Sequence, residues 1–358
     1  MNTTMTITIN GVEVGNESPV YFIADIAANH DSDLARAKEL IYRAAEAGAD
    51  AAKFQNFTAA TIVSDKGFRD LGSQVSHQAA WEDSVYDVYD RASLNVDWTL
   101  ELKECCVDAG IAYMTTPYNL ECIEKLDQHV DAFKIGSGDI TWHDIINKIA
   151  NINKPYMLAT GASDINEVML AARSCLQVNS DFVLMQCNTN YTASRENFRF
   201  INLNVLKMYK REFGDVILGL SDHTLGDVTV LGAVALGAKV IEKHFTDDTT
   251  RKGPDHSFSM DPASWKAMVE RTRDLEAALG AEEKKVEENE KDTVVVQRRS
   301  ARLKRNMQSG EPLQLANIEY LRPAPNDALA PYQITDFEGK ALKRSKAAGD
   351  YLTTEDFE

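Results

Sequence analysis

The sequence of 358 residues lacks the features that mark several classes of protein. Its five cysteines are an odd number and include no CxxC pair, which argues against a disulfide framework and against a zinc ribbon. No apolar run approaches the roughly 20 residues that a helix needs to span a bilayer. The N-terminus has neither the basic nor the apolar region of a signal peptide. We therefore expect a reduced, cytoplasmic protein that does not enter a membrane.

Positive charge is also scarce, with 38 lysines and arginines against 55 aspartates and glutamates. The net charge of -17 would repel nucleic acid and anionic membranes, so we expect neither as a partner. No GxGxxG motif follows the first predicted strand, which disfavours dinucleotide binding. An acidic exterior is still compatible with a local basic pocket for an anionic substrate.

Short apolar runs alternate with amphipathic segments along most of the chain. The predicted strands cover residues 21–26, 50–55, 111–115, 131–135, 155–160, 181–187, 216–220 and 239–242. The predicted helices cover about residues 34–47, 98–109, 120–127, 145–150, 203–213, 225–236 and 262–279, with one more opened by a Ser163 cap. This alternation predicts an α/β fold, a (β/α)8 TIM barrel, with a doubly wound open sheet as the alternative.

Three segments fall outside the alternation. Residues 4–14 alternate apolar and polar side chains around Asn10-Gly11, which predicts a hairpin that covers one end of the barrel. Residues 57–93 have weak periodicity and are predicted as an elaborated loop near the active face. The charged run AEEKKVEENEKD is typical of a linker. We therefore predict a barrel domain at 1–280, a linker at 281–295 and a small C-terminal domain at 296–358.

Two histidines give the clearest functional indication. His223 and His244 each follow a short apolar run, so each is expected where a strand ends. Because the carboxyl ends of barrel strands gather on one face, two neutral imidazoles there could form half of a metal site. The alternative is that each histidine only caps its strand through hydrogen bonds. The charged loop Arg251–His256 could close over the same face.

Two lysines inside predicted strands need an explanation, because a buried lysine is costly unless it is paired with an anion. Lys53 and Lys134 could pair with internal carboxylates, or they could bind a substrate that carries a phosphate and a carboxylate. Hydroxyl groups at nearby strand ends favour the second interpretation, and a metal beside such an anion would suit carbonyl polarisation. Other polar residues at the strand ends are Asp25, Gln55, Thr116, Ser137, Asp139, Thr189, Tyr191 and Ser221.

Six ordered strings resemble the sialic acid (N-acetylneuraminate) synthase family: GADAAKFQ, TTPYN, FKIGSGD, GLSDHT, GAVALGAKVIEKHF and GPDHSFSMDP. The resemblance covers nearly the whole chain and includes a C-terminal antifreeze-like (SAF) domain. It implies a nonulosonic acid synthase, a transferase that condenses phosphoenolpyruvate with an open-chain acylamino hexose and releases phosphate. The hexose would be N-acetylmannosamine or a diacetamido-trideoxyhexose. The resemblance also implies a domain-swapped homodimer, cell-surface polysaccharide biosynthesis, and a divalent metal, Mn2+ or Mg2+ with Co2+ as a further candidate.

The resemblance assigns roles to most of the candidate residues, and His223 and His244 would bind the metal. In the mechanism that we expect from this constellation, Asp25 or Asp139 is the base that assists the addition of water. The residues implied to hold phosphoenolpyruvate are Lys53, Thr116, Lys134, Ser137 and Ser221, and the two lysines would also stabilise charge during the reaction. The residues implied to face the sugar are Gln55, Tyr191 and Asp255, with Thr189 as a further candidate for substrate binding. Arg322 would reach over the substrate from the C-terminal domain of a second subunit.

Four positions depart from the family pattern. Asp25 and Asp139 stand where glutamates are usual, so each carboxylate reaches one methylene less far. Ala159 stands in place of a serine, and Thr192 in place of a proline. These changes keep the reaction class but leave the choice of acylamino sugar open, because carboxylate reach and pocket shape decide which groups fit.

Two other functions are alternatives. A metal-dependent sugar epimerase or hydrolase on a TIM barrel would use the two histidines, but such sites usually add a carboxylate ligand and would leave both lysines idle. A non-catalytic carbohydrate- or ice-binding protein is suggested only by the C-terminal segment. That function would leave the polar face of the barrel unexplained.

Overall fold

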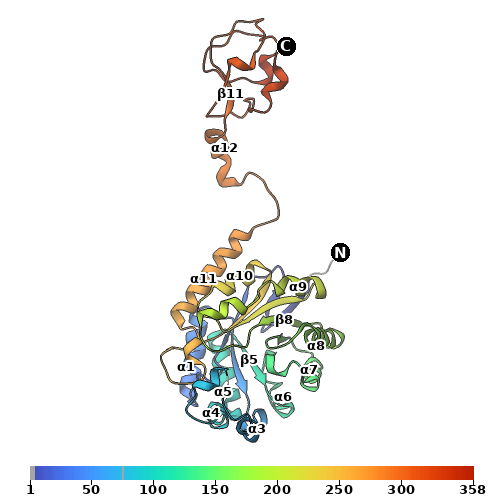
Figure 1. Cartoon of the computed structure of the whole chain (residues 1–358), viewed down its shortest axis with the longest axis vertical. Helices are drawn as coiled ribbons and strands as arrows, with labels where there is room; N and C mark the ends of the chain where they lie inside the picture. Colours follow the sequence, from blue (N-terminus) through green and yellow to red (C-terminus); the bar gives the residue numbers. More distant parts are fainter. Residues whose placement is uncertain (1–4, 75) are drawn as a thin grey trace. The chain divides into compact units, whose positions relative to one another are not determined.

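The computed structural model describes residues 5–74 and 76–358, and in them eight parallel strands close into a barrel (Figure 1). The strands are β3 (Tyr21–Asp25), β4 (Ala51–Asn56), β5 (Ala112–Pro117), β6 (Ala132–Ile135), β7 (Tyr156–Ala159), β8 (Phe182–Cys187), β9 (Ile217–Asp222) and β10 (Ala238–His244). β10 pairs with β3, which closes the barrel. The predicted TIM barrel is therefore confirmed, and the open sheet is excluded.

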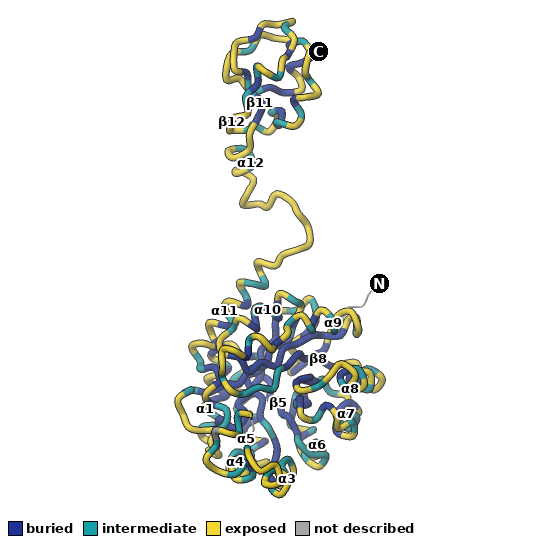
Figure 2. Tube along the Cα trace, viewed as in Figure 1, coloured by how far each residue is buried: buried dark blue, intermediate teal, exposed yellow. Residues whose placement is uncertain are grey.

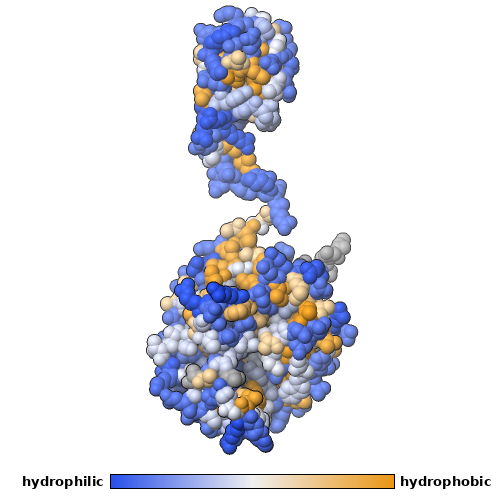
Figure 3. Space-filling view, in the orientation of Figure 1, coloured by the Kyte–Doolittle hydropathy of each residue, from blue (hydrophilic) through white to orange (hydrophobic). Residues whose placement is uncertain are grey.

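Helices cover the outside of the barrel, and all but the last of them, α11, connect two of its strands (Figure 1). They are α1 (Leu34–Glu46), α5 (Thr99–Ala109), α6 (Leu120–Leu126), α7 (His143–Ala150), α8 (Ile165–Val178), α9 (Val205–Phe213), α10 (Val228–Ala235) and α11 (Pro262–Leu279). Their outer faces are exposed whereas the strands are buried (Figure 2), and hydrophilic residues cover much of the visible surface (Figure 3). Across the described part of the chain, no helix combines the length and the apolar character that crossing a membrane requires.

The start of α8 differs from its prediction. Asp164, not Ser163, is the N-cap: its carboxylate accepts hydrogen bonds from the backbone N–H groups of Asn166 and Glu167. The Glu167 carboxylate in turn accepts a hydrogen bond from the Asp164 backbone N–H, which completes a capping box. The Ser163 hydroxyl donates instead to the carbonyl oxygens of Thr160 and Gly161, so it does not cap the helix.

The start of α10 also differs, because the helix begins at Val228 rather than at Leu225. The hydroxyl groups of Thr224 and Thr229 both donate to the buried Asp222 carboxylate, at 2.9 Å and 2.7 Å. These two bonds accompany a bend at residues 224–227, and the helix starts directly after it.

The segment predicted as a loop is largely helical. It forms α2 (Ala59–Ile62), α3 (Asp65–Asp70), a 310 helix (Ser76–Ala80) and α4 (Val85–Ala92). Val75 lies within the predicted loop and outside the described residues. Helices of one or two turns are too short to show clear apolar periodicity, which explains the wrong prediction.

The predicted N-terminal hairpin is confirmed. β1 (Thr6–Ile9) and β2 (Val12–Gly15) pair antiparallel about Asn10-Gly11, while Thr4, the first residue of the predicted range, lies outside the described residues. The side chains of Ile7, Ile9 and Val14 are buried in one apolar cluster with side chains from the first half of the barrel strands. The hairpin therefore covers the amino-terminal end of the barrel.

Side chains inside the barrel change from apolar to polar along the strands. Because alternate residues of a strand point to the same side, Ile23 is followed inside the barrel by Asp25, and Ala51 by Lys53. The first of each pair belongs to the apolar cluster, and the second lines a chamber near the strand ends. The barrel therefore has an apolar floor beneath a polar chamber.

The chain divides into two units, Met1–Gly280 and Ala281–Glu358. In the second unit, residues 281–290 are exposed throughout, and α12 (Lys291–Gln297) occupies the end of the predicted linker. β11 (Ser300–Leu303) then pairs antiparallel with β12 (Ile318–Leu321). This unit has an apolar core of its own, which includes Leu303, Leu313, Ile334, Leu342 and Leu352.

β9 contains a glycine where the barrel has no room for a side chain. A Cβ on Gly219 would lie 2.8 Å from the carbonyl oxygen of Val240 and 3.0 Å from Cγ of Met185. We predict that Gly219→Ala lowers the free energy of unfolding by about 1–3 kcal/mol, because a strand or Met185 must move. Thermal denaturation followed by circular dichroism measures this. Gly138→Ala is the control, since a Cβ there meets nothing within 4 Å; unchanged melting of Gly219→Ala would contradict the prediction.

Candidate active site

The polar chamber contains two buried lysines and two buried carboxylates. Lys53 on β4, Lys134 on β6, Asp25 on β3 and Glu242 on β10 are each at most 4% exposed. Lys53 Nζ lies 2.7 Å from Asp25 Oδ2, and Lys134 Nζ lies 2.6 Å from Glu242 Oε1. The charges are therefore balanced in pairs, as the alternative interpretation of the lysines expected, and all four side chains also line the chamber.

Asp25 holds Lys53 in place. The strand register sets Asp25 opposite Lys53, and the Gln55 amide also donates to Asp25, at 3.0 Å. Burial alone would raise the pKa of Asp25, but the Lys53 charge and these hydrogen bonds lower it to about 2. Asp25 is therefore ionised at neutral pH, and it is a weak proton acceptor.

Glu242 is a charged chamber residue that was not predicted from the sequence. Its Oε1 accepts hydrogen bonds from Lys134, and from Ser221 Oγ at 3.1 Å. Its Oε2 has no hydrogen-bond partner in the described part of the chain, and it lies 3.9 Å from Lys53 Nζ. A buried carboxylate oxygen without a partner is costly, so this oxygen marks a position for a donor. A signal in the sequence could have identified it. Glu242 is two residues before His244, and alternate residues of a strand point to the same side of the sheet.

Hydroxyl groups complete the chamber. Thr116 Oγ1 lies 3.2 Å from Lys53 Nζ, and Ser221 Oγ lies 3.4 Å from Lys134 Nζ. Ser137 Oγ also lines the chamber, where it accepts a hydrogen bond from the Gly161 backbone N–H at 2.9 Å. The structure thus brings together the residues that were predicted to hold phosphoenolpyruvate.

Two other residues, Thr189 and Arg322, were predicted to contact the substrate. Thr189 is close to Gly161, where an added Cβ would meet its Cγ2 at 2.7 Å, and it is not among the residues that line the chamber. Arg322 belongs to the second unit, is exposed, and donates through Nε to the carbonyl oxygen of Gln297 at 2.6 Å. The substrate-binding roles of Thr189 and Arg322 stay predictions.

His223 and His244 lie side by side after β9 and at the end of β10, with ring centroids 5.3 Å apart. Burial lowers the pKa of His223 to about 4 and that of His244 to about 3, so both rings are neutral at pH 7. His223 Nδ1 lies 3.0 Å from the Asn188 carbonyl oxygen and must donate to it, which leaves Nε2 with a free lone pair. Within the described residues, His244 Nδ1 has no hydrogen-bond partner, so strand capping does not account for this pair.

Two neutral imidazoles fit a divalent metal ion that leaves positions open for substrate. Among residues 5–74 and 76–358, no group of three or more histidine, cysteine, aspartate or glutamate side chains is arranged to hold a metal ion. The protein would therefore supply His223 and His244, and water and substrate oxygens would supply the other ligands. The metal itself stays a prediction.

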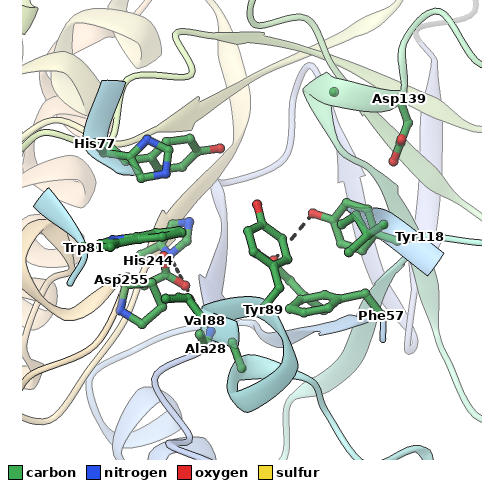
Figure 4. A pocket seen from close by; sticks show the side chains of 16 residues that line it. Ala28, Phe57, His77, Trp81, Val88, Tyr89, Tyr118, Asp139, His244 and Asp255 are labelled. Atoms are coloured by element: carbon green, nitrogen blue, oxygen red, sulfur yellow. Dashed lines mark hydrogen bonds and ion pairs between the residues drawn. The ribbon is translucent and has the colours of Figure 1, made fainter. Parts of the chain in front are cut away.

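A second cavity, of about 340 Å3, adjoins the chamber (Figure 4). Gln55, Tyr118, Tyr191 and His244 line both spaces, so the two lie next to each other. Much of the wall of this outer cavity comes from the segment that was predicted as a loop. That segment therefore lies at the active face, as predicted, although its structure is helical.

Two carboxyl groups line the outer cavity, with Asp139 on one side and Asp255 on the other (Figure 4). Burial raises the pKa of Asp139 to about 6 and that of Asp255 to about 7. In the described residues, Asp139 Oδ2 has no hydrogen-bond partner, while Asp255 Oδ2 accepts from the Ala28 backbone N–H at 3.1 Å. Both groups can therefore take up or release a proton near neutral pH.

The loop Arg251–His256, which carries Asp255, is fixed by Asp31. The Asp31 carboxylate accepts a hydrogen bond from Arg251 Nη2 at 2.7 Å and is 3.0 Å from His256 Nε2. The other ring nitrogen of the fully buried His256 lies 2.7 Å from Thr246 Oγ1. These contacts hold the predicted closing loop against the loop that follows β3, and they place Asp255 beside Ala28.

A model of the NeuB family matches residues 40–284, and a model of the SAF domain matches residues 298–358. The chain belongs to the NeuB family. It is 34% identical over 357 residues to N,N'-diacetyllegionaminic acid synthase of Legionella pneumophila, covering 98% of each chain. It is 31% identical over 274 residues to human N-acetylneuraminate-9-phosphate synthase, covering 76% of this chain and 75% of that one.

A solved structure is similar over most of the chain. The crystal structure of N-acetylneuraminic acid synthetase from Leptospira borgpetersenii, a complex with citrate, has a TM-score of 0.71 and 27% identity. The similarity covers 81% of this chain and 95% of that chain. Together these similarities confirm the family resemblance, and they place the chain among the nonulosonic acid synthases, which are enzymes.

We predict that Asp139→Asn stabilises the protein increasingly as the pH rises. Burial disfavours the ionised form of Asp139 and raises its pKa from 3.8 to about 6. The protein therefore has its full stability below pH 4, where this carboxyl group is neutral, and it loses part of that stability as the pH rises through 6. The variant avoids this loss, and its advantage in free energy of unfolding should grow by about 1 kcal/mol between pH 5 and pH 8. Urea denaturation at both pH values measures it. Asp144→Asn, the same change at an exposed position of α7, controls for net charge; equal behaviour of the two variants would contradict the prediction.

Proposed function

We propose that this protein condenses phosphoenolpyruvate with an open-chain acylamino hexose, giving a nonulosonic acid and inorganic phosphate. The observation that carries the proposal is the chamber, in which two buried lysines lie beside two buried neutral histidines at the strand ends. Phosphoenolpyruvate carries both a phosphate and a carboxylate, and ammonium groups bind each of these. The names of the relatives agree with this chemistry.

The lysines can bind the substrate without losing their present partners. An ammonium group has three N–H donors, so Lys53 can bond to Asp25 and Lys134 to Glu242 while each also donates to a substrate oxygen. The two carboxylates then serve to hold the lysines charged and in position. The hydroxyl groups of Thr116, Ser137 and Ser221 would supply further donors.

The proposed reaction forms a bond between C3 of phosphoenolpyruvate and the aldehyde carbon of the sugar. A divalent ion on His223 and His244 would supply Lewis-acid polarisation of the aldehyde oxygen. Water then adds at C2 of the former phosphoenolpyruvate and loses a proton, and phosphate leaves from the same carbon. We assign this proton to Asp139 rather than to Asp25, because the pKa of Asp139 is about 6 whereas Asp25 is held ionised by Lys53. Asp255 can return a proton to the oxygen of the former aldehyde.

We predict that phosphate release requires both substrates and a divalent ion. With phosphoenolpyruvate, a panel of acylamino hexoses and Mn2+, release should depend on the sugar. Treatment with EDTA should lower the rate by at least about a hundredfold, as the loss of one electrostatic stabiliser does in other enzymes, and Mn2+ should restore it. Full activity after chelation would contradict the metal assignment, and sugar-independent release would contradict the condensation.

We predict that Lys134→Met abolishes this activity even where the fold is intact. The single variant leaves Glu242 buried without its partner, which by itself costs about 3–5 kcal/mol. The double variant Lys134→Met/Glu242→Gln removes both charges and should fold, yet its sugar-dependent phosphate release should fall by at least about a hundredfold. Lys148→Met/Glu124→Gln makes the same two changes at a pair between α7 and α6 on the surface and is the control. Wild-type activity in the Lys134 double variant would remove Lys134 from the site.

A further inference from the structure

A further buried ion pair lies next to the two histidines in sequence, on the outer side of the barrel strands. Lys243 on β10 and Asp222 on β9 are neighbours in the strand register, and Lys243 Nζ lies 2.5 Å from Asp222 Oδ2. Both side chains are 1% exposed. Successive residues of a strand point to opposite sides, so this pair faces away from the chamber, which Ser221 and Glu242 line. The proposed reaction uses neither charge.

This ion pair holds the segment that carries His223 on both sides of the histidine. Asp222 precedes His223 and Thr224 follows it. Lys243 Nζ donates to the Asp222 carboxylate and, at 2.7 Å, to the Thr224 carbonyl oxygen. The backbone N–H and the hydroxyl group of Thr224 both donate to the same carboxylate. Because Lys243 is itself the residue before His244, one ammonium group links the backbone at the two histidines.

α10 fixes this arrangement from the outside. Thr229 Oγ1, in the first turn of α10, lies 2.7 Å from Asp222 Oδ2 and 2.8 Å from Thr224 Oγ1. We call Asp222, Thr224, Thr229 and Lys243 the outer network, and all four are at most 3% exposed. Each of these side chains makes a hydrogen bond within the network, and a buried polar network whose groups are satisfied is rigid. The network therefore ties β9, β10 and α10 together at the segment that carries His223.

The histidine rings depend on such support from the backbone. A histidine that binds a metal is usually oriented by a hydrogen bond to its second ring nitrogen. His223 has such a bond, to the Asn188 carbonyl oxygen. Among the residues that the structure describes, His244 Nδ1 has no hydrogen-bond partner, and Nε2 lies 3.6 Å from Asp25 Oδ2. Packing against Phe258, whose ring centroid is 4.9 Å away, and the backbone of β10 therefore set the position of His244.

We propose that the outer network positions His223 and His244 for binding a divalent metal ion. This inference rests on the proposed function and adds positioning residues that do not touch the substrate. Replacing a buried ion pair by apolar residues of similar size is often neutral or stabilising, so stability alone does not account for Lys243 and Asp222. A fixed separation between two metal ligands does account for them, because the ion pair joins the two chain segments on which the ligands lie.

Two variants weaken the network and leave both histidines unchanged. Lys243→Met/Asp222→Asn removes both charges and keeps the length of each side chain. Thr229→Val keeps the shape of the side chain and removes one hydroxyl donor to Asp222, while the ion pair stays in place. The second variant is the milder one, so it tests the inference even where the first does not fold.

Each variant has a matched control. Lys103→Met/Asp131→Asn makes the same two changes at a partly buried pair between α5 and the residue before β6, where the charged atoms lie 2.6 Å apart. This pair lies at the amino-terminal end of β6, away from the chamber. Thr272→Val makes the same change in α11, where a fully buried hydroxyl group donates to the Met268 carbonyl oxygen.

The first measurement is the Kd of the full-length protein for Mn2+ without substrates, from the electron paramagnetic resonance signal of free Mn2+. Changing the outer partners of metal ligands typically lowers metal affinity by about 10–100-fold. Because the network acts through the backbone, we expect the lower end, with Kd raised about tenfold in the double variant and about threefold in Thr229→Val. Both controls should keep the wild-type Kd, whatever their melting temperatures.

The second measurement is sugar-dependent phosphate release as a function of Mn2+ concentration. The double variant should need about tenfold more Mn2+ for half of its maximal rate. At saturating Mn2+, its kcat and its KM for phosphoenolpyruvate should return to near the wild-type values.

Three outcomes are informative. Raised Kd values in the network variants and unchanged ones in the controls support the inference. A wild-type Kd in every network variant that folds would overturn it and leave the proposed function intact. No binding of Mn2+ by the wild-type protein would overturn the metal assignment in the proposed function, and this inference with it.

Discussion

The pairing of four buried charges inside a closed barrel is the constraint on which the rest of this site depends. Taking Lys53, Lys134, Asp25 and Glu242 out of water costs several kcal/mol for each ion, and only close pairing offsets that cost. The strand register provides the pairing between Asp25 and Lys53, which are direct neighbours on β3 and β4. Apolar residues of similar size would fill this space at least as stably. The charges are therefore best explained by what they bind.

Different parts of the chain build the two adjoining spaces. Side chains of the barrel strands enclose the chamber, where the backbone hydrogen bonds of the sheet fix each position. Helices and loops after the strands enclose the outer cavity, where packing of aromatic rings fixes the wall. The chamber thus lies on the most regular part of the fold. The outer cavity lies on the part that can vary in sequence without disturbing the barrel.

The environments of the carboxyl groups separate their roles. Asp25 lies against an ammonium group and stays ionised. Asp139 and Asp255 have no cationic partner at hydrogen-bond distance among the residues that the structure describes, and desolvation raises their pKa values to about 6 and about 7. One residue type therefore supplies both a fixed charge and groups that exchange protons near neutral pH. Sequence alone could not show this difference, because it depends on which atoms surround each carboxylate in the folded chain.

The barrel and most residues of the chamber were predictable from the sequence. A short apolar run predicts a strand, and polar residues at the end of that run are expected on the face of the barrel where the carboxyl ends of the strands meet. Glu242 was missed because it lies within its strand, between an apolar residue and a charged one. Only the alternation of side chains along a strand relates it to His244. The inserted helices were missed because they are too short to show periodicity. The wall made by Trp81 and Val88 depends on tertiary packing that no local pattern encodes, and the separate roles of the site residues came from family resemblance.

The most direct test of the chamber is a crystal structure of the protein with phosphoenolpyruvate and Mn2+. The account predicts that oxygens of the phosphate and the carboxylate lie within about 3 Å of Lys53 Nζ and Lys134 Nζ, as charge-assisted hydrogen bonds require. It also predicts that the ion lies on His223 and His244. Phosphoenolpyruvate bound outside the barrel, with both lysines still bonded only to Asp25 and Glu242, would contradict it.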